Sequence, residues 1–94
     1  MSLKFEWDED KDFANRKKHG ISFETAAYVF RDEYYIEMYD FEHSIDEDRY
    51  IAIGMVGDLL FVVFTERKEH IRLISARLAT ESERRLYYDQ NFYN

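Results

Sequence analysis

The second half of the chain contains four arginines whose type and spacing could do chemistry. A guanidinium group keeps its charge at physiological pH and binds phosphate or carboxylate oxygens through two parallel hydrogen bonds. The four residues are Arg49, Arg67, Arg72 and Arg77. This pattern predicts either an anion-binding surface or a set of ordinary salt bridges, and composition alone does not separate the two.

Metal-free cleavage of RNA is one reaction that such arginines serve when carboxylates and imidazoles stand beside them. It needs a base for the 2′-hydroxyl proton, cations for the charge that builds up on the phosphate, and an acid for the leaving 5′ oxygen. The candidates for the base are Glu47 and Glu66, and the candidates for the acid are His19, His70 and Tyr87. Spacing alone leaves these alternatives open, because arginines and glutamates on a small sheet usually form salt bridges.

Metal, nucleophile and nucleotide sites have weaker support. The three histidines do not pair at the spacing of a metal site, and the chain has no cysteine, so neither a metal nor another cofactor is predicted. The acidic stretch after His43 could hold a cation loosely, but a solvated loop is the favoured interpretation. Ser75 is not on a nucleophile elbow, and the sequence has no glycine-rich phosphate-binding loop.

Length and composition predict one domain over residues 1–94 with one modest core. Eight phenylalanines, eight tyrosines and one tryptophan can supply that core with large buried areas. No apolar run approaches the roughly 18 residues of a membrane span. No secretory leader is recognisable, so the expected location is the cytoplasm.

The formal net charge of −7 argues against indiscriminate binding to nucleic acids. The charge is uneven, because residues 1–48 contain 14 acidic and 6 basic side chains, whereas residues 49–94 contain 6 acidic and 7 basic ones. All of the basic residues in the second half except Lys68 are arginines. A polyanionic substrate therefore needs a locally positive surface built by these arginines.

In the first half, the hydrophobic pattern predicts a strand and two helices. The alternation in residues 3–7 is typical of a half-buried strand. Asp8 is predicted to cap a helix that ends in a basic turn, 16–19, with Gly20 just beyond its end. That basic turn complements the helix dipole, and it could also meet a phosphate. Ser22 is predicted to cap a second, short helix with one apolar face.

After these helices, four strands and a helix are predicted over residues 34–39, 49–56, 59–65, 71–77 and 81–91. The run 59–65 is apolar on both faces, which predicts the central strand of a sheet. The charged segment 66–70 is predicted to form a loop of about five residues between two antiparallel strands. The fold class is therefore α+β, with a small curled antiparallel sheet of about four to five strands, flanked by two N-terminal helices and a C-terminal helix.

The order and spacing of several short motifs resemble those of the BrnT family of toxins over nearly the whole chain. Single pieces such as Lys18-His19-Gly20 are unspecific, but the ordered set is characteristic. The segments that carry the resemblance are Phe5-Glu6-Trp7-Asp8, Asn15, Lys18-His19-Gly20, Ser22-Phe23-Glu24, Ala26-Ala27, Val29-Phe30, Asp40, His43-Ser44, Glu47 with Arg49, Gly54, Val63 with Thr65 and Arg67, Ile71-Arg72-Leu73-Ile74-Ser75-Ala76-Arg77, Glu83-Arg84-Arg85 and Tyr87.

This resemblance implies a ribonuclease toxin of a type II toxin–antitoxin system, with a fold similar to that of the RelE-like toxins. The implied activity is a metal-independent endoribonuclease that cleaves RNA and thereby arrests translation. The implied partner is a BrnA-like antitoxin with a ribbon-helix-helix DNA-binding domain. The complex of the two proteins would repress its own operon, and contact with operator DNA would come only through the antitoxin.

Carried over motif by motif, the resemblance implies a set of site residues, namely Lys18, His19, Glu47, Arg49, Arg67, Arg72 and Arg77. Arg49, Arg67 and Arg77 are expected to clamp the phosphate, with Lys18 as a further source of positive charge. Glu47 or His19 is the expected proton carrier. The acidic net charge leaves a second expectation open, in which the chain is a weak or inactive member that serves as an antitoxin-binding co-repressor.

Overall fold

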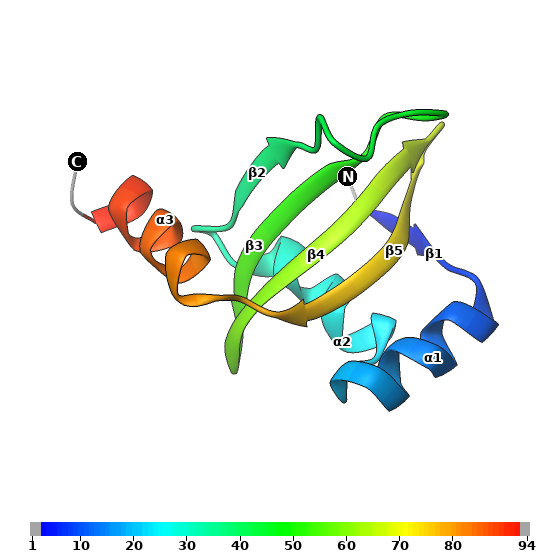
Figure 1. Cartoon of the computed structure of the whole chain (residues 1–94), viewed down its shortest axis with the longest axis horizontal. Coiled ribbons are helices and arrows are strands. Elements are labelled where there is room, and N and C mark those ends of the chain that lie inside the picture. The colour runs from blue at the N-terminus through cyan, green and yellow to red at the C-terminus, as the bar shows by residue number, and fades with distance from the viewer. Residues whose placement is uncertain (1–2, 93–94) are drawn as a thin grey trace.

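The computed structural model describes residues 3–92, and its elements follow the order predicted from the sequence (Figure 1). The strands are β1 (Lys4–Glu6), β2 (Ile36–Tyr39), β3 (Tyr50–Val56), β4 (Asp58–Arg67) and β5 (His70–Leu78). The helices are α1 (Glu9–His19), α2 (Phe23–Ala27) and α3 (Glu81–Phe92), and a 3₁₀ turn, η1 (Tyr28–Arg31), continues α2. In this part of the chain, no helix is long and apolar enough to cross a membrane.

The five strands form one sheet in the order β1-β5-β4-β3-β2. The strands β2 to β5 form the predicted antiparallel meander, and the apolar β4 lies at the centre of the sheet. However, β1 pairs with β5 in parallel, so the sheet is mixed and the prediction of a purely antiparallel sheet was wrong. Two helices and three strands separate β1 from β5, and a connection of that length lets the chain return in the parallel direction.

The hairpin between β4 and β5 is tighter than predicted. Because β4 continues through Arg67 and β5 begins at His70, the five-residue loop predicted over 66–70 was wrong. The turn is made by Lys68-Glu69, and Lys68 has a left-handed backbone conformation with φ 56°. The prediction failed because cross-strand pairing, as between Arg67 and His70, keeps charged residues within the ladder.

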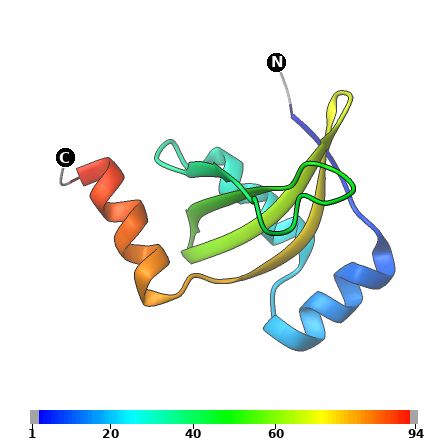
Figure 2. The same ribbon diagram turned by 45° about the horizontal axis from the view of Figure 1, so that its top comes forward.

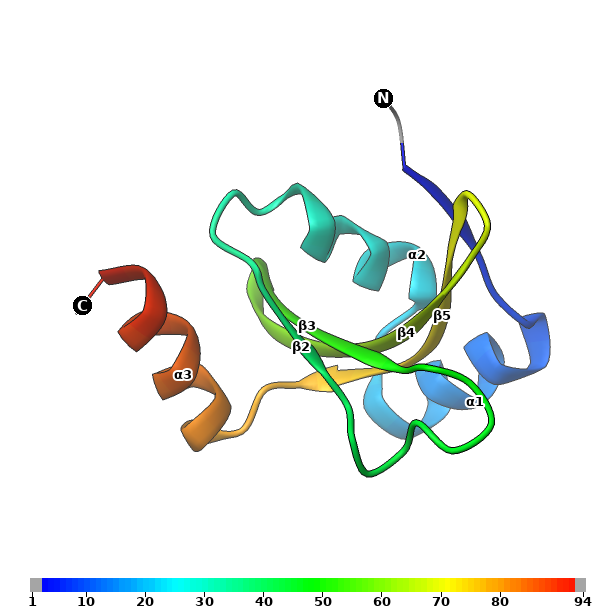
Figure 3. The same ribbon diagram turned by 90° about the horizontal axis from the view of Figure 1, so that it is seen from above.

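The sheet separates two hydrophobic clusters. On one face, the buried Phe23 of α2 and Val29 of η1 pack with Val62 of β4. On the other face, Tyr87 of α3 packs with Leu59 of β4. Figure 3 shows α2 on one side of the sheet, and α3 with the β2–β3 loop (residues 40–49) on the other. The prediction that the central strand is buried from both sides is therefore confirmed.

We call the α3 side of the sheet the open face, because side chains at its centre are only half-buried. Val63 of β4 lies there between Ile51 of β3 and Ser75 of β5, and all three are partly exposed. The next residue back along β4, Val62, points to the α2 face and is fully buried. The open face is therefore the part of the sheet on which a ligand could rest.

The helix α1 lies along the edge of β5, beyond the end of β1, and Figure 2 shows α1 and α3 at opposite ends of the sheet. The buried Asn15 fastens α1 there. Its amide donates to the carbonyls of Ala76 at 2.8 Å and Ile21 at 2.9 Å, and its oxygen accepts from the Ala76 N–H at 3.2 Å. One side chain thus continues the hydrogen bonding of the sheet where the short β1 strand has ended.

The predicted helix ends are confirmed. Asp8 caps α1 by accepting hydrogen bonds from two N–H groups of its first turn, and Gly20 follows α1 with φ 72°. Ser22 caps α2 with its side-chain oxygen. Thr80 and Glu83 form the reciprocal capping box of α3, with distances of 2.8 and 3.3 Å. These local signals determine where the helices begin, and so they help to position the helices around the sheet.

Candidate functional site

The β2–β3 loop is held over the open face by hydrogen bonds at its base. The backbone N–H of Asp40 donates to the Arg49 carbonyl at 2.9 Å. The Ser44 hydroxyl donates to the Asp40 carbonyl at 2.6 Å and accepts from the Arg49 N–H at 2.8 Å. Thr65 of β4 donates to the Asp48 carbonyl at 2.6 Å. Asp40 and Arg49 therefore stand side by side where the sheet meets the loop.

Arg49 borders a small cavity on the open face. The cavity has a volume of about 150 Å³ and is lined by Asp40, His43, Arg49, Val63, Ile74 and Ser75. The Nε atom of Arg49 is buried and has no hydrogen-bond partner among residues 3–92. A buried N–H group without a partner costs about 1–3 kcal/mol. The arrangement therefore favours an anion that accepts a hydrogen bond from this guanidinium group.

Arg67, at the end of β4, reaches back to the same loop. Its Nη2 atom lies 3.3 Å from Oε2 of Glu47, and both side chains are substantially exposed. An exposed ion pair of this kind contributes about 0–1 kcal/mol, so a phosphate can compete for the arginine. Glu47 and Arg49 also line a second cavity of about 240 Å³. The structure thus brings together three of the predicted site residues, Glu47, Arg49 and Arg67.

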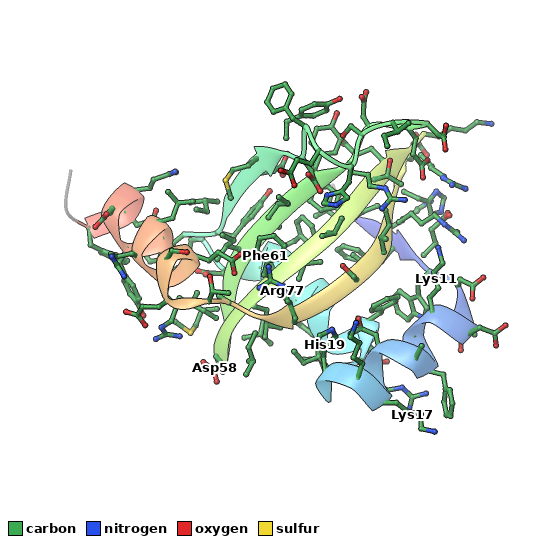
Figure 4. The ribbon with its side chains drawn as sticks, in the orientation of Figure 1. Lys11, Lys17, His19, Asp58, Phe61 and Arg77 are labelled. Atoms are coloured by element: carbon green, nitrogen blue, oxygen red, sulfur yellow. The ribbon has the colours of Figure 1, made fainter. Side chains whose placement is uncertain are left out.

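Arg77 lies farther along the open face, over the middle of the sheet (Figure 4). Its Cζ atom lies 3.9 Å from the centre of the Phe61 ring. Its two terminal nitrogens donate to the two carboxylate oxygens of Glu83, at 2.8 and 2.9 Å. The hydrogen bonds with Glu83 raise the pKa of Arg77 further, against the opposing effect of burial. This predicted phosphate clamp is therefore held by a carboxylate of α3.

Glu83 joins Arg77 to the start of α3, so its loss should weaken the fold in a pH-dependent way. Burial raises the pKa of Glu83, but hydrogen bonds from Arg77 and Thr80 outweigh it and the pKa lies below its usual 4.5. The stabilisation is therefore complete above the unfolded-state pKa and is lost as the pH falls through the lower folded-state pKa. We expect Glu83→Gln to lower the free energy of unfolding by about 1–2 kcal/mol at pH 7.

Urea denaturation of the parent and the Glu83→Gln variant from neutral to acidic pH measures this effect. The difference between them should shrink progressively once the pH falls below 4.5, the usual value for glutamate. Glu81→Gln changes an exposed carboxylate of the same helical turn and should alter stability by less than about 0.5 kcal/mol. A difference that stays constant as the pH falls would contradict the role of the ionised carboxylate.

Arg72 of β5 is engaged at the edge of the sheet and lies outside the two cavities. Its Nη1 atom lies 2.6 Å from Oε2 of Glu6 in β1, and both side chains are about one-third exposed. The two residues are partners in the register of the parallel pair β1–β5. The ion pair therefore fastens β1 to β5, which gives Arg72 a structural contact in addition to its predicted place in the site.

Lys18 and His19 lie in the last turn of α1, and both are exposed. Figure 4 shows His19 beside β5, on the side where Asn15 fastens α1 to Ala76. Neither residue lines the cavities around Arg49. The structure therefore does not place these two predicted residues in direct contact with the group formed by the β2–β3 loop.

Two of the other candidates for proton transfer, Glu66 and Tyr87, also lie apart from that group. Glu66 has the same parity in β4 as the buried Phe64, so it lies on the α2 face. Tyr87 is buried under α3 and its hydroxyl donates to Asp32 at 2.6 Å. Burial and this hydrogen bond raise the pKa of Tyr87 well above its ordinary value of 10. His70 is the cross-strand partner of Arg67 at the start of β5, but it does not line either cavity beside Arg49.

One pair beside Arg49 was not among the predicted site residues. The Nδ1 atom of His43 lies 3.0 and 3.1 Å from the two carboxylate oxygens of Asp40. The Asp40 side chain is only 11% exposed, whereas the His43 side chain is 63% exposed. The signal in the sequence was a histidine three residues after an aspartate at the end of a strand. The sequence alone favours a solvated acidic loop at this place.

The arginines of the predicted site do not create a strongly positive face, because carboxylates stand beside them. Arg67, Arg72 and Arg77 each form an ion pair with a glutamate. The cavity beside Arg49 also includes the carboxylate of Asp40. A phosphate must therefore compete with a paired glutamate for Arg67, Arg72 or Arg77.

Comparisons with known families and solved structures gave matches. A family model described as the ribonuclease toxin BrnT of type II toxin–antitoxin systems matches residues 7–83. The chain is also similar to the crystal structure of the Brucella abortus ribonuclease toxin BrnT, with a TM-score of 0.62 and 25% sequence identity. That match covers 85% of this chain and 100% of the Brucella chain. A comparison with curated proteins gave no significant match.

Proposed function

This chain belongs to the BrnT family of ribonuclease toxins of type II toxin–antitoxin systems, and we propose that it cleaves RNA without a metal ion, on the open face beside Arg49. A 2′ oxygen of the RNA would attack the adjacent phosphorus and release the 5′ oxygen, and the cut would arrest translation. The observation that carries this placement is the buried Arg49 Nε, which has no hydrogen-bond acceptor within residues 3–92. A phosphate oxygen in the cavity would supply one.

Arg49 and Arg67 are the phosphate clamps that the geometry supports best, because Arg49 stands at the base of the β2–β3 loop and Arg67 pairs with Glu47 of that loop. Arg77 would bind the RNA farther along the open face, where the phosphate competes with Glu83. Lys18 would add positive charge from the end of α1. Arg72 would act mainly by holding β1 to β5, through its ion pair with Glu6.

Glu47 and His19 remain the proton carriers that the family resemblance implies. Glu47 is the better placed of the two, since it lines the 240 Å³ cavity together with Arg49. The ion pair of Glu47 with Arg67 would have to open before the carboxylate could accept a proton. His19 would need an RNA that extends along β5 to the end of α1.

The proposed mechanism uses arginines in place of a metal ion. Within residues 3–92, no three histidine, aspartate or glutamate side chains gather in a way that could hold a metal ion. Arginines can provide the electrostatic stabilisation of a phosphorane in place of a metal. Arg49 and Arg67 have the right chemistry for this task.

The partner of a type II toxin is a protein antitoxin. We propose that the antitoxin here is BrnA-like with a ribbon-helix-helix domain, and that the complex represses its own operon in the cytoplasm. The net charge of −7 supports a complex in which operator DNA is contacted through the antitoxin alone, since an acidic chain is repelled by DNA. We also propose a relationship to the RelE-like toxins, which the antiparallel meander with flanking helices supports.

Cleavage of a labelled single-stranded RNA by the purified protein in EDTA tests this function. We expect fragments that end in a 2′,3′-cyclic phosphate, because the 2′ oxygen is the nucleophile. Arg67→Ala and Arg77→Ala are expected to cleave at least about 10-fold more slowly than the parent. If free RNA is not cut, the assay is repeated with ribosome-bound mRNA. Cleavage that requires added Mg²⁺, or that leaves 3′-hydroxyl ends, would contradict the proposal.

A weak or inactive toxin that serves as an antitoxin-binding co-repressor is the second candidate function. The observation that favours it is the engagement of Arg67, Arg72 and Arg77 by glutamates of the same chain. Expression without an antitoxin separates the two candidates. Growth arrest supports the nuclease, whereas normal growth in cells that accumulate folded protein supports the co-repressor.

A further inference from the structure

His43 stands between the two cavities of the open face. It lines both the 150 Å³ cavity over the sheet and the 240 Å³ cavity along the β2–β3 loop. Arg49 is the other residue common to both linings. An imidazole and a guanidinium group therefore border the same space, so a phosphate that binds to Arg49 has His43 as a neighbour.

The hydrogen bonds of His43 determine which of its ring nitrogens can take part in chemistry. An ionised carboxylate accepts hydrogen bonds and cannot donate them, so the Nδ1 atom that contacts Asp40 carries a hydrogen. In the neutral imidazole this leaves Nε2 as the atom that can accept a proton. The His43 side chain is 63% exposed, so a substrate can reach it.

Asp40 holds the imidazole from a position that the fold itself fixes. Its side chain is 11% exposed, and its backbone N–H is bonded to the Arg49 carbonyl at the base of the loop. The hydroxyl of Ser44 also donates to the Asp40 carbonyl at 2.6 Å. The pair of Asp40 and His43 is therefore oriented relative to Arg49 before any substrate binds.

We propose that His43, oriented by Asp40, is the proton carrier for RNA cleavage; this inference rests on the proposed function. Nε2 of His43 takes the proton of the 2′-hydroxyl as the 2′ oxygen forms its bond to phosphorus. The bond from phosphorus to the 5′ oxygen breaks, and the leaving 5′ oxygen takes a proton from water. The imidazolium then returns its proton to the hydroxide so formed, which leaves the enzyme unchanged.

His43 fits this task better than the two residues implied by the family resemblance. Glu47 is paired with Arg67, and His19 lies outside both cavities. An imidazole is also a stronger base than a carboxylate, so it takes a hydroxyl proton more readily. Besides Asp40 and Arg49, the charged groups that line the two cavities with His43 are Asp46 and Glu47.

His43→Ala tests the inference, measured beside the parent protein on the RNA or ribosome-bound mRNA that the parent cleaves. We expect the cleavage rate to fall by about 100-fold or more. Binding of a non-cleavable 2′-O-methyl RNA should change by less than about threefold, because the phosphate clamps remain. Added imidazole should restore part of the cleavage by His43→Ala, and it should not restore cleavage by Arg49→Ala.

Two further variants separate catalysis from structure. Asp40→Asn keeps the shape of the side chain but loses its charge, and we expect it to slow cleavage while the protein stays folded. Glu42→Ala changes the exposed neighbour of His43 and should leave the rate within about threefold of the parent.

The outcomes separate the failure of this inference from the failure of the proposed function. An active parent whose His43→Ala variant keeps its rate, or is not restored by imidazole although it binds the RNA analogue, would overturn the role of His43 alone. A variant that loses RNA binding together with activity would overturn it as well. A folded parent that cleaves neither free nor ribosome-bound RNA would overturn the proposed function, and the inference with it.

Discussion

Replacing Arg49 with alanine is expected to reduce kcat/KM for RNA cleavage by about 100- to 1,000-fold. The guanidinium group borders both cavities, and its buried Nε, which has no partner in the described part of the chain, can donate to a phosphate. The free energy of unfolding should change by less than about 1 kcal/mol, because no hydrogen bond of Nε is lost. Initial rates on a labelled RNA and urea denaturation of the same preparations measure the two quantities.

Arg84→Ala is the matched control for the loss of one positive charge. Arg84 lies on α3 and pairs with Asp58 at 3.5 Å, away from both cavities. We expect it to keep the parent rate within about threefold, because a surface charge of this kind has a small effect. Equal losses in the two variants would show that net charge, and not the position of Arg49, determines activity.

Replacing Asn15 with alanine is expected to have the largest effect on stability, lowering the free energy of unfolding by about 3 kcal/mol. The change removes three hydrogen bonds and leaves the N–H and carbonyl of Ala76 and the carbonyl of Ile21 without their buried partner. For a domain of this size we expect the Tm to fall by roughly 10–20 °C. Thermal unfolding followed by circular dichroism measures the shift.

Lys11→Ala tests whether that loss is specific to the buried amide. Lys11 lies on the exposed side of α1, and its backbone N–H still reaches Asp8 in the variant. We expect the free energy of unfolding to change by less than about 0.5 kcal/mol. A small effect of Asn15→Ala, similar to that of Lys11→Ala, would mean that α1 is not fastened to β5 in the way described.

The parts of the fold that were predictable from the sequence depend on local signals. Asp8, Gly20 and Ser22 mark helix ends through hydrogen bonds and backbone conformations that involve only their near neighbours. The segment 59–64 is apolar at every position, and burial from both sides follows from that alone. Such features need no knowledge of distant residues, which is why they were confirmed.

The direction of β1 and the length of the β4–β5 turn depend on distant pairing instead. The hydrophobic pattern of residues 3–7 predicts a strand but does not determine which neighbour that strand pairs with. Similarly, the charges at 66–70 are compatible with a loop or with the ends of two paired strands. The pairing of β1 with β5 determines the direction of β1, and the pairing of β4 with β5 determines the length of their turn. The hydrophobic periodicity of the sequence does not specify either pairing.

The candidate site was predictable in its residue types but not in their relationships. Whether an arginine is free or paired depends on glutamates elsewhere in the chain, as with Arg72 and Glu6, which lie 66 residues apart. By contrast, Asp40 and His43 are only three residues apart. Their contact still escaped prediction, because it depends on how the β2–β3 loop turns over the sheet.

The position of the Arg49 side-chain Nε–H resonance in the NMR spectrum tests the site most directly. A 2′-O-methyl RNA, which cannot be cleaved, is added to the nitrogen-15-labelled protein, and the Arg49→Ala variant assigns the resonance. We predict that the Arg49 resonance shifts on binding while that of Arg84 stays in place. An unchanged Arg49 resonance at saturating RNA, together with shifts confined to the α2 face, would contradict the assignment of the open face as the RNA site.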